Sequence, residues 1–325
     1  MLPVGMPPRA ATMPLLLLSG EWDELWDLAS VTRREGSPLE RPMAVMILGH
    51  LLRNRGKPDE AWEMVREILP RGPASEPEET LFPYATETLR LATRLSIDSG
   101  EIDRAQTWLD AHDGWLNWSG ASRGRAESMT LHSEILRLMG SLVDAEQAAV
   151  EAVSIASEPW QPVALIHAER TLGQILMQRG NEPAAEAHLA RALELANACA
   201  IPLDQSLSEI ALARLYRTQG RERDEIERLL TAARERAEYL AATPLVVEID
   251  SLLTDPIEAN GHVSLTARER EVLRMIAQGM TDAEAAEHLF ISPRTVSQHM
   301  RSVYNKLGVT SRAAATRWAV QNGQV

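Results

Sequence analysis

Residues 281–308 read TDAEAAEHLFISPRTVSQHMRSVYNKLG, a stretch that predicts two short helices joined by a tight turn. Thr281 begins the first helix and Glu284 takes its third position, which is the pattern of a capping box. Ser292 caps the second helix, and Pro293 takes its first position, where the missing N–H costs no hydrogen bond. This arrangement predicts a helix-turn-helix, whose second helix lies in a DNA major groove.

Further caps predict one helix before this pair and one after it. Thr266 begins a helix with Glu269 as its capping partner, and Gly279 stands where a left-handed residue would end it. Ser311 begins the last helix. The C-terminal part of the chain is therefore expected to hold four short helices.

The helix that starts at Pro293 has one apolar and one polar face. Its apolar residues recur at spacings of four, three and four, as Val296, Met300, Val303 and Leu307, and predict a face packed on a small core. The opposite face holds Arg294, Ser297, Gln298, Arg301 and Asn305. No Asp or Glu occurs from residue 288 to residue 325, which suits a surface that neutralises phosphates and releases their counterions. The alternative is a small bundle whose basic side is merely solvated.

Together these residues resemble the LuxR-type DNA-binding domain. The matching positions are Leu265-Thr266-Ala267-Arg268-Glu269-Arg270-Glu271-Val272-Leu273, Gly279, Ile291-Ser292-Pro293-Arg294-Thr295-Val296, His299, Lys306-Leu307-Gly308-Val309 and Ser311-Arg312. The resemblance implies a bacterial transcription factor, usually dimeric, whose third helix reads the major groove.

The resemblance also implies which residues touch DNA. Positions matching Ser297, Gln298 and Arg301 face bases in that family. Those matching Thr281, Arg294, Thr295, His299 and Lys306 lie near the DNA backbone. This sequence has Ala285 where Ile is usual and Ser297 where Lys is frequent, so the bases it recognises cannot be copied from a relative.

A repeated glycine organises the preceding 255 residues. Gly100, Gly140, Gly180 and Gly220 lie 40 residues apart, with Gly56 and Gly20 before them at intervals of 44 and 36. Five residues after the glycine an alanine recurs, as Ala61, Ala105, Ala145 and Ala185, whereas the end repeats are weaker and have Leu25 and Glu225 there. This pattern predicts a helix, a left-handed glycine turn, and a second helix that approaches the first closely through a small residue. The expected fold is all-α: a solenoid of helical hairpins followed by the four-helix domain.

The repeat resembles tetratricopeptide repeats, although its period is longer than the usual ~34 residues. Such an array with a LuxR-type domain at its C-terminus looks like the sensor-effector half of MalT-like ATP-dependent regulators. No ATPase module is expected, because Gly56-Lys57 is followed by Pro58 and lacks the upstream Gly of a P-loop. The helix before Gly20 is too short to pair well, which suggests a shortened or fragmentary relative, or a chain whose N-terminal face a partner covers.

Charge separates the same two parts of the chain. The formal net charge is −13, yet residues 261–325 hold 8 basic and 5 acidic side chains, so residues 1–260 carry −16. The expected organisation is a flexible N-terminus at 1–14, tetratricopeptide-like sensor or interaction repeats at 15–253, a linker at 254–263 and a LuxR-type domain at 264–325. With Cys199 as its single cysteine and no long apolar run, the chain is expected to be cytoplasmic.

No catalytic, metal or cofactor site is expected, because the eight His residues lack metal-ligand spacing and no nucleophile elbow occurs. Trp108 is interpreted as core. Trp115 and Trp118, near a glycine-containing break, either pack or contact a ligand or partner.

The sequence therefore predicts a homodimeric regulator of transcription that binds double-stranded DNA, while its repeats sense a small-molecule or protein effector. The alternative is an interaction scaffold whose C-terminal bundle binds protein and not DNA.

Overall fold

The computed structural model describes residues 10–77, 80–254, 265, 267–289, 292–307, 309 and 312–321. Every regular element in these ranges is a helix, as the all-α expectation requires. The chain divides into two compact units, Met1–Thr254 and Asp255–Val325. No described helix is long and apolar enough to cross a membrane.

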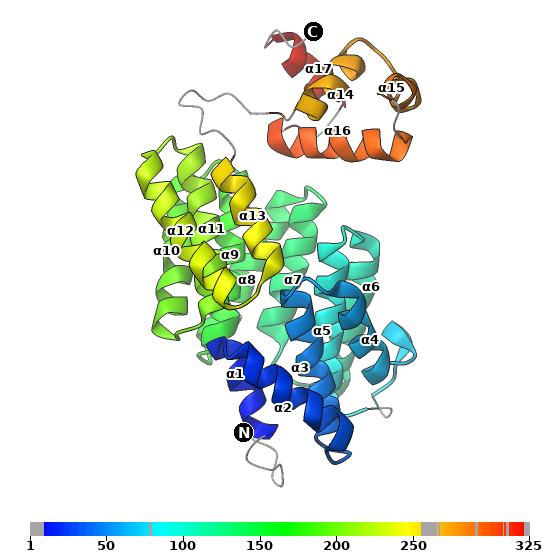
Figure 1. Ribbon diagram of the computed structural model, residues 1–325, viewed down its shortest axis with the longest axis vertical. Coiled ribbons are helices and arrows are strands. Elements are labelled where there is room, and N and C mark those ends of the chain that lie inside the picture. The colour runs from blue at the N-terminus through cyan, green and yellow to red at the C-terminus, as the bar shows by residue number, and fades with distance from the viewer. Residues whose placement is uncertain are drawn as a thin grey trace. The chain divides into compact units, whose positions relative to one another are not determined.

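The first unit is a series of helical hairpins (Figure 1). Its α-helices are α1 (Met13–Ser19), α2 (Trp22–Glu35), α3 (Arg41–Asn54), α4 (Pro58–Ile68), α5 (Phe82–Asp98), α6 (Ile102–Ser119), α7 (Arg125–Leu138), α8 (Leu142–Ser157), α9 (Pro162–Gln178), α10 (Glu182–Ala198), α11 (Pro202–Thr218), α12 (Arg223–Tyr239) and α13 (Thr243–Thr254). Short 3-10 helices lie at Ala10–Thr12 and Gly72–Ala74.

The repeat predicted from the glycines is confirmed. Each of the six glycines closes a hairpin between two helices with a positive φ, from 66° to 85°. The residues five positions later in the first five hairpins are all fully buried: Leu25, Ala61, Ala105, Ala145 and Ala185. After Gly220 the buried position shifts by one, to Ile226, while Glu225 remains partly exposed.

The array curls back so that its first turns meet its last helices. Leu18 packs against a core cluster that includes Ala164, Ala196 and Ile201. A Cβ placed on Gly20 would lie 2.8 Å from both Leu240 and Pro202. The short α1 therefore contacts the far end of the array as well as α2, so part of the face expected to need a partner is covered by the chain itself.

The second unit holds four helices around its own core: α14 (Ala267–Ala277), α15 (Asp282–Leu289), α16 (Pro293–Leu307) and α17 (Arg312–Gln321). The predicted apolar face of α16 is confirmed, because Val296, Met300 and Val303 are buried in this core and Leu307 packs against it. All four helices contribute buried residues, for example Val272, Ala285 and Ala315 beside Val296. The core thereby sets which side of α16 faces outward.

Candidate nucleic-acid interface

The turn that leads into α15 is built by local hydrogen bonds. Gly279 ends α14 with a φ of 95°, as expected of a left-handed residue. The N–H of Thr281 donates to the Glu284 carboxylate at 2.7 Å, and the N–H of Glu284 donates to Thr281 Oγ1 at 3.3 Å. This is the predicted capping box, and it fixes the start of α15.

The start of α16 is capped by Ser292. Its Oγ accepts from the N–H of Thr295 at 3.1 Å and lies 2.8 Å from Thr295 Oγ1. The carbonyl of Ser292 also accepts from the N–H groups of Thr295 and Val296, so Ser292 closes the first turn of α16. The cap expected at Thr266, the glycine end at Gly308 and the start at Ser311 lie outside the described residues.

The residues expected to face bases lie on the side of α16 away from the core. Ser297 and Arg301 are exposed. Gln298 belongs to the same helix, but its side chain lies outside the described residues. Arg301 makes no ion pair with any described residue, and its side chain is exposed.

The residues expected near the DNA backbone have mixed surroundings. Thr281 is exposed, whereas Thr295 and His299 are half-buried. Arg294 and Lys306 are in α16, with side chains outside the described residues. The structure thus brings Thr281 and Thr295 to the N-terminal ends of α15 and α16, where backbone N–H groups favour anions.

Asp282 is a residue of this surface that the sequence did not single out. Its Oδ2 accepts from Ser297 Oγ at 2.7 Å, and its Oδ1 accepts from Arg312 Nη1 at 2.6 Å. Arg312 Nη2 also donates to the carbonyl of Met280. Asp282, Ser297 and Arg312 together form what we call the Asp282 clamp, which joins α15, α16 and α17.

The Asp282 clamp changes the interpretation of Arg312. Arg312 is one of the eight basic side chains of residues 261–325, but its guanidinium is engaged by Asp282 and the carbonyl of Met280. The Ser297 hydroxyl and then Arg312 hold the pKa of Asp282 below its ordinary value of 3.8, although partial burial opposes this. Asp282 is therefore a carboxylate at neutral pH.

A second contact ties α14 to α16. Glu269, expected only as a capping partner of Thr266, is buried and accepts from Ser302 Oγ at 2.6 Å. Nearby, Arg268 donates to the carbonyl of Leu289 at 2.7 Å. The first contact joins α14 to α16 and the second joins α14 to α15. Neither involves Arg301, which stays exposed.

The two tryptophans offered as a ligand or partner surface have different surroundings. Trp115 is 3% exposed and its indole N–H donates to the carbonyl of Ser75 at 3.1 Å. It therefore packs inside the array, where its polar edge is satisfied. Trp118 is 62% exposed, and Trp108 is buried as expected.

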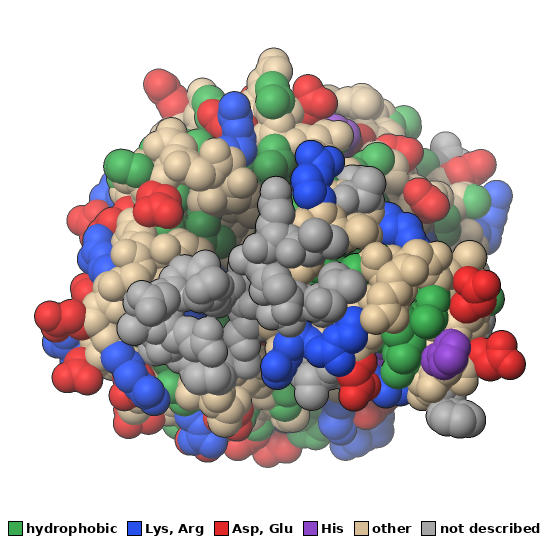
Figure 2. Space-filling view, turned by 90° about the horizontal axis from the view of Figure 1, so that it is seen from above, with side chains coloured by type: hydrophobic (Ala, Val, Ile, Leu, Met, Phe, Trp, Pro, Cys, Tyr) green, Lys and Arg blue, Asp and Glu red, His purple; other side chains and the backbone are tan. Residues whose placement is uncertain are grey.

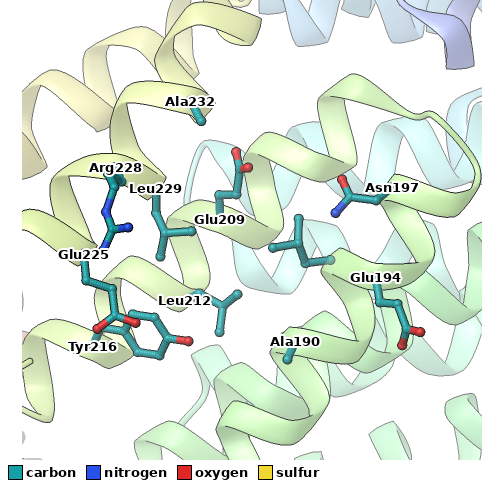
Figure 3. Close-up of a pocket in the computed structure, with 11 residues that line it drawn as sticks. Ala190, Glu194, Asn197, Glu209, Leu212, Tyr216, Glu225, Arg228, Leu229 and Ala232 are labelled. Carbon is teal, nitrogen blue, oxygen red and sulfur yellow. The ribbon is translucent and has the colours of Figure 1, made fainter.

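An open surface groove of about 580 Å³ lies elsewhere in the array, between α10, α11 and α12 (Figure 3). Leu212 and Leu229 supply apolar walls, and Glu225 and Arg228 supply charge. Burial raises the pKa of Glu209 in this wall, against the opposing effect of Arg236.

Over the surface in Figure 2, acidic and basic side chains are interspersed. In the described part of the chain, no group of His, Cys, Asp and Glu could hold a metal ion.

Comparison with known proteins identifies the C-terminal unit. Residues 263–319 match the family described as bacterial regulatory proteins, luxR family. The probable transcriptional regulatory protein SgaR of Hyphomicrobium methylovorum is 48% identical over 69 residues, which are 21% of this chain and 30% of that protein. A putative HTH-type transcriptional regulator of Mycobacterium tuberculosis is 43% identical over 65 residues, 20% of this chain and 7% of that protein. The chain thus carries a LuxR-family helix-turn-helix domain and spans less than a third of these relatives.

Solved structures resemble the array in fold. A Rap protein complexed with Competence and Sporulation Factor superimposes with a TM-score of 0.59 at 11% identity, covering 90% of this chain and 82% of that one. A signal transduction ATPase with a tetratricopeptide repeat sensor, from Pyrococcus horikoshii, gives a TM-score of 0.50 at 13% identity, covering 74% of this chain and 36% of that one. The tetratricopeptide-like fold expected from the glycine repeat is confirmed.

Proposed function

We propose that this chain is a DNA-binding regulator of transcription that reads the major groove with α16. The observation that carries the proposal is a LuxR-family domain in which Ser297 and Arg301 are exposed on the side of α16 opposite its packed core. Relatives of this domain are transcriptional regulators, and the family is regulatory and not enzymatic. We accordingly propose no catalytic role, and a cytoplasmic location.

In the proposed complex Arg301 pairs with guanine, while Ser297 and Gln298 read neighbouring base edges. An Arg–guanine pair contributes roughly 1–3 kcal/mol of discrimination. Arg294, Thr295, His299, Lys306 and Thr281 position the DNA backbone, together with the N–H groups at the start of α16. Two copies of the chain bind as a dimer, with half-sites about one helical turn apart.

The array is proposed to sense a small molecule or a protein. Two features support this. The fold is similar to a protein with a tetratricopeptide repeat sensor and to a Rap protein complexed with Competence and Sporulation Factor, and an open groove lies between α10 and α12. We propose the segments 1–14, 15–253, 254–263 and 264–325 as N-terminus, sensor, linker and DNA-binding domain. In this arrangement an effector shifts the balance between dimer-competent and incompetent forms.

Selection of random duplexes by the purified full-length chain at moderate salt tests the DNA-binding function. Enrichment of a two-fold symmetric site is expected. Arg301→Ala should relax the base preference at one position, whereas Lys306→Ala should weaken all sequences alike and flatten the salt dependence. An identical loss for every sequence in both variants would contradict these roles.

The competing function is a scaffold whose C-terminal unit binds protein. DNA binding should fall steeply as salt rises, with a slope set by the number of phosphates neutralised. If neither the full chain nor residues 256–325 bind duplex DNA at any salt concentration, the scaffold is favoured.

A further inference from the structure

The Asp282 clamp determines what the Ser297 hydroxyl can offer to a base. A serine hydroxyl normally acts as donor or acceptor, and for that reason serine discriminates poorly between bases. Here Ser297 Oγ lies 2.7 Å from Asp282 Oδ2, at a position where α16 is exposed. The question is which of the two atoms supplies the hydrogen.

The hydrogen belongs to Ser297. Because the pKa of Asp282 is held below its ordinary value, its carboxylate is ionised and can only accept. The single hydroxyl hydrogen of Ser297 is therefore committed to Asp282. What remains toward the solvent is an oxygen with a free lone pair, which the charge on Asp282 makes a stronger acceptor.

Arg312 keeps this arrangement in place from the other side. Its Nη1 donates to Asp282 Oδ1 at 2.6 Å, while its Nη2 donates to the carbonyl of Met280. One carboxylate oxygen is thus directed at α17 and the other at Ser297. A carboxylate held at both oxygens has little freedom to release the serine.

We infer that Ser297, restricted to accepting, selects a base with an amino group in the major groove, cytosine or adenine, and that Asp282 is the positioning residue that imposes this choice. Cytosine N4 and adenine N6 donate in that groove, whereas guanine and thymine present O6, N7 and O4 acceptors. Guanine or thymine would place an acceptor against Ser297 Oγ, which has no hydrogen left to donate. This inference rests on the proposed DNA-binding function.

The same selection experiment on the full-length chain tests it with Ser297→Ala. The wild-type chain should favour cytosine or adenine by about tenfold at one position in each half-site, as expected for one hydrogen bond to an otherwise unpaired group. Ser297→Ala should lose the preference at that position alone. Since Ser297 is exposed and lies away from the core, this variant should keep its fold.

Asp282→Asn is the sharper variant. Arg312 should hold the amide oxygen, so that the amide NH2 faces Ser297 and donates to its Oγ. The serine hydrogen is then free, so the hydroxyl can again donate as well as accept, and the preference for cytosine or adenine at the same position should be lost. Glu287→Gln is the matched control, because it removes one negative charge from an exposed residue of the same helix and should leave every base preference unchanged.

Three results would overturn the inference. The first is a wild-type preference for guanine or thymine at the position that Ser297→Ala erases. The second is an unchanged preference in Asp282→Asn with an unchanged thermal midpoint. The third is a preference that survives Ser297→Ala but not Asp282→Asn, which would mean that Asp282 itself contacts the base. Absence of any enriched site with the wild-type chain would instead refute the proposed DNA-binding function, and this inference with it.

Discussion

The array and the C-terminal unit differ in how much of their charge is paired. In the array, charged groups bridge the first helices of successive hairpins: Arg53 to Asp98 at 2.7 Å, Arg94 to Glu134 at 3.5 Å, and Arg170 to Asp204 at 2.8 Å. In the C-terminal unit, Arg312 pairs with Asp282 at 2.6 Å, but Arg301 of α16 is exposed and has no ion pair among the described residues. Ion pairs therefore join helices in both units, whereas α16 also keeps a cation at the surface.

Removing the buried carboxylate of Asp204 from its ion pair should give the largest loss of stability. Asp204 is 4% exposed, and although burial opposes its ionisation, His167 and Arg170 hold its pKa well below the usual range. Asp204→Ala leaves the half-buried Arg170 guanidinium without its carboxylate and should cost about 3–5 kcal/mol of unfolding free energy. Urea unfolding of the full chain, monitored by circular dichroism, measures this loss of unfolding free energy.

The matched control is Glu67→Ala, which removes the exposed pair with Arg33. Because solvent screens that pair, its loss should cost less than about 1 kcal/mol. Equal losses in the two variants would show that the buried bridges do not stabilise the array.

The contact between the first turn of the array and its last helices should give the next largest effect on stability. Gly20 and Gly140 share a φ of 85°, but a Cβ on Gly20 would meet Leu240 and Pro202, whereas nothing lies within 4 Å of one on Gly140. Each Gly→Ala change should cost about 1–2 kcal/mol for the left-handed backbone. Gly20→Ala should cost about 1–3 kcal/mol more, because the neighbours must move. If thermal unfolding shows the two variants to be equally stable, the first turn does not contact the last helices.

A pH dependence should follow from His50 in α3. Burial lowers the pKa of His50 to about 4, with Glu87 opposing and Arg53 adding to the shift. The unfolded chain, with a His pKa near 6.5, then binds a proton that the folded chain refuses. Folding stability should fall by about 2 kcal/mol between pH 7 and pH 5 on this account. In urea titrations at each pH, His50→Gln should lose about 2 kcal/mol less stability than the wild-type chain between pH 7 and pH 5. If stability falls equally with pH in the two proteins, His50 is not the cause of the fall.

The smallest predicted effect lies in the C-terminal unit. Ser302→Ala removes the hydrogen bond to Glu269 and should cost about 1 kcal/mol there. Amide hydrogen exchange in α14 and α16 should quicken about fivefold while exchange in the array stays the same. Arg301→Ala, at an exposed position with no described ion pair, should leave exchange in both units unchanged. Faster exchange in the array after Ser302→Ala would mean that the two units are not independent in stability.

What the sequence predicted well depends on short-range interactions. The capping box at Thr281 and Glu284 and the left-handed turn at Gly279 both involve atoms a few residues apart. Such contacts form in any fold that contains the helix, so the pattern of residue types is enough to predict them. The four C-terminal helices and the apolar face of α16 were predicted on the same basis.

The sequence was less informative where the partner is distant along the chain. It left Trp115 as either a packing or a ligand-contacting residue, because nothing local shows that Ser75, 40 residues earlier, accepts from its indole. It did not reveal that Arg312 pairs with Asp282, because Asp282 lies 30 residues before it. An acidic residue directly after a helix cap was the one available signal for Asp282, and helix capping explained it without any tertiary contact.

By itself, the sequence determined that this chain is helical, that it repeats with a period near 40 residues and that it ends in a helix-turn-helix, because periodicity and caps act over one or two helical turns. Only the tertiary structure decided that Gly20 lies against Pro202, and that the hydroxyl of Ser297 is engaged by a carboxylate on α15. Those contacts depend on how each helix is rotated about its axis and on the summed curvature of successive hairpins. A change of a few degrees per repeat moves the two ends of the array by many ångströms, and no local pattern of residues encodes that sum.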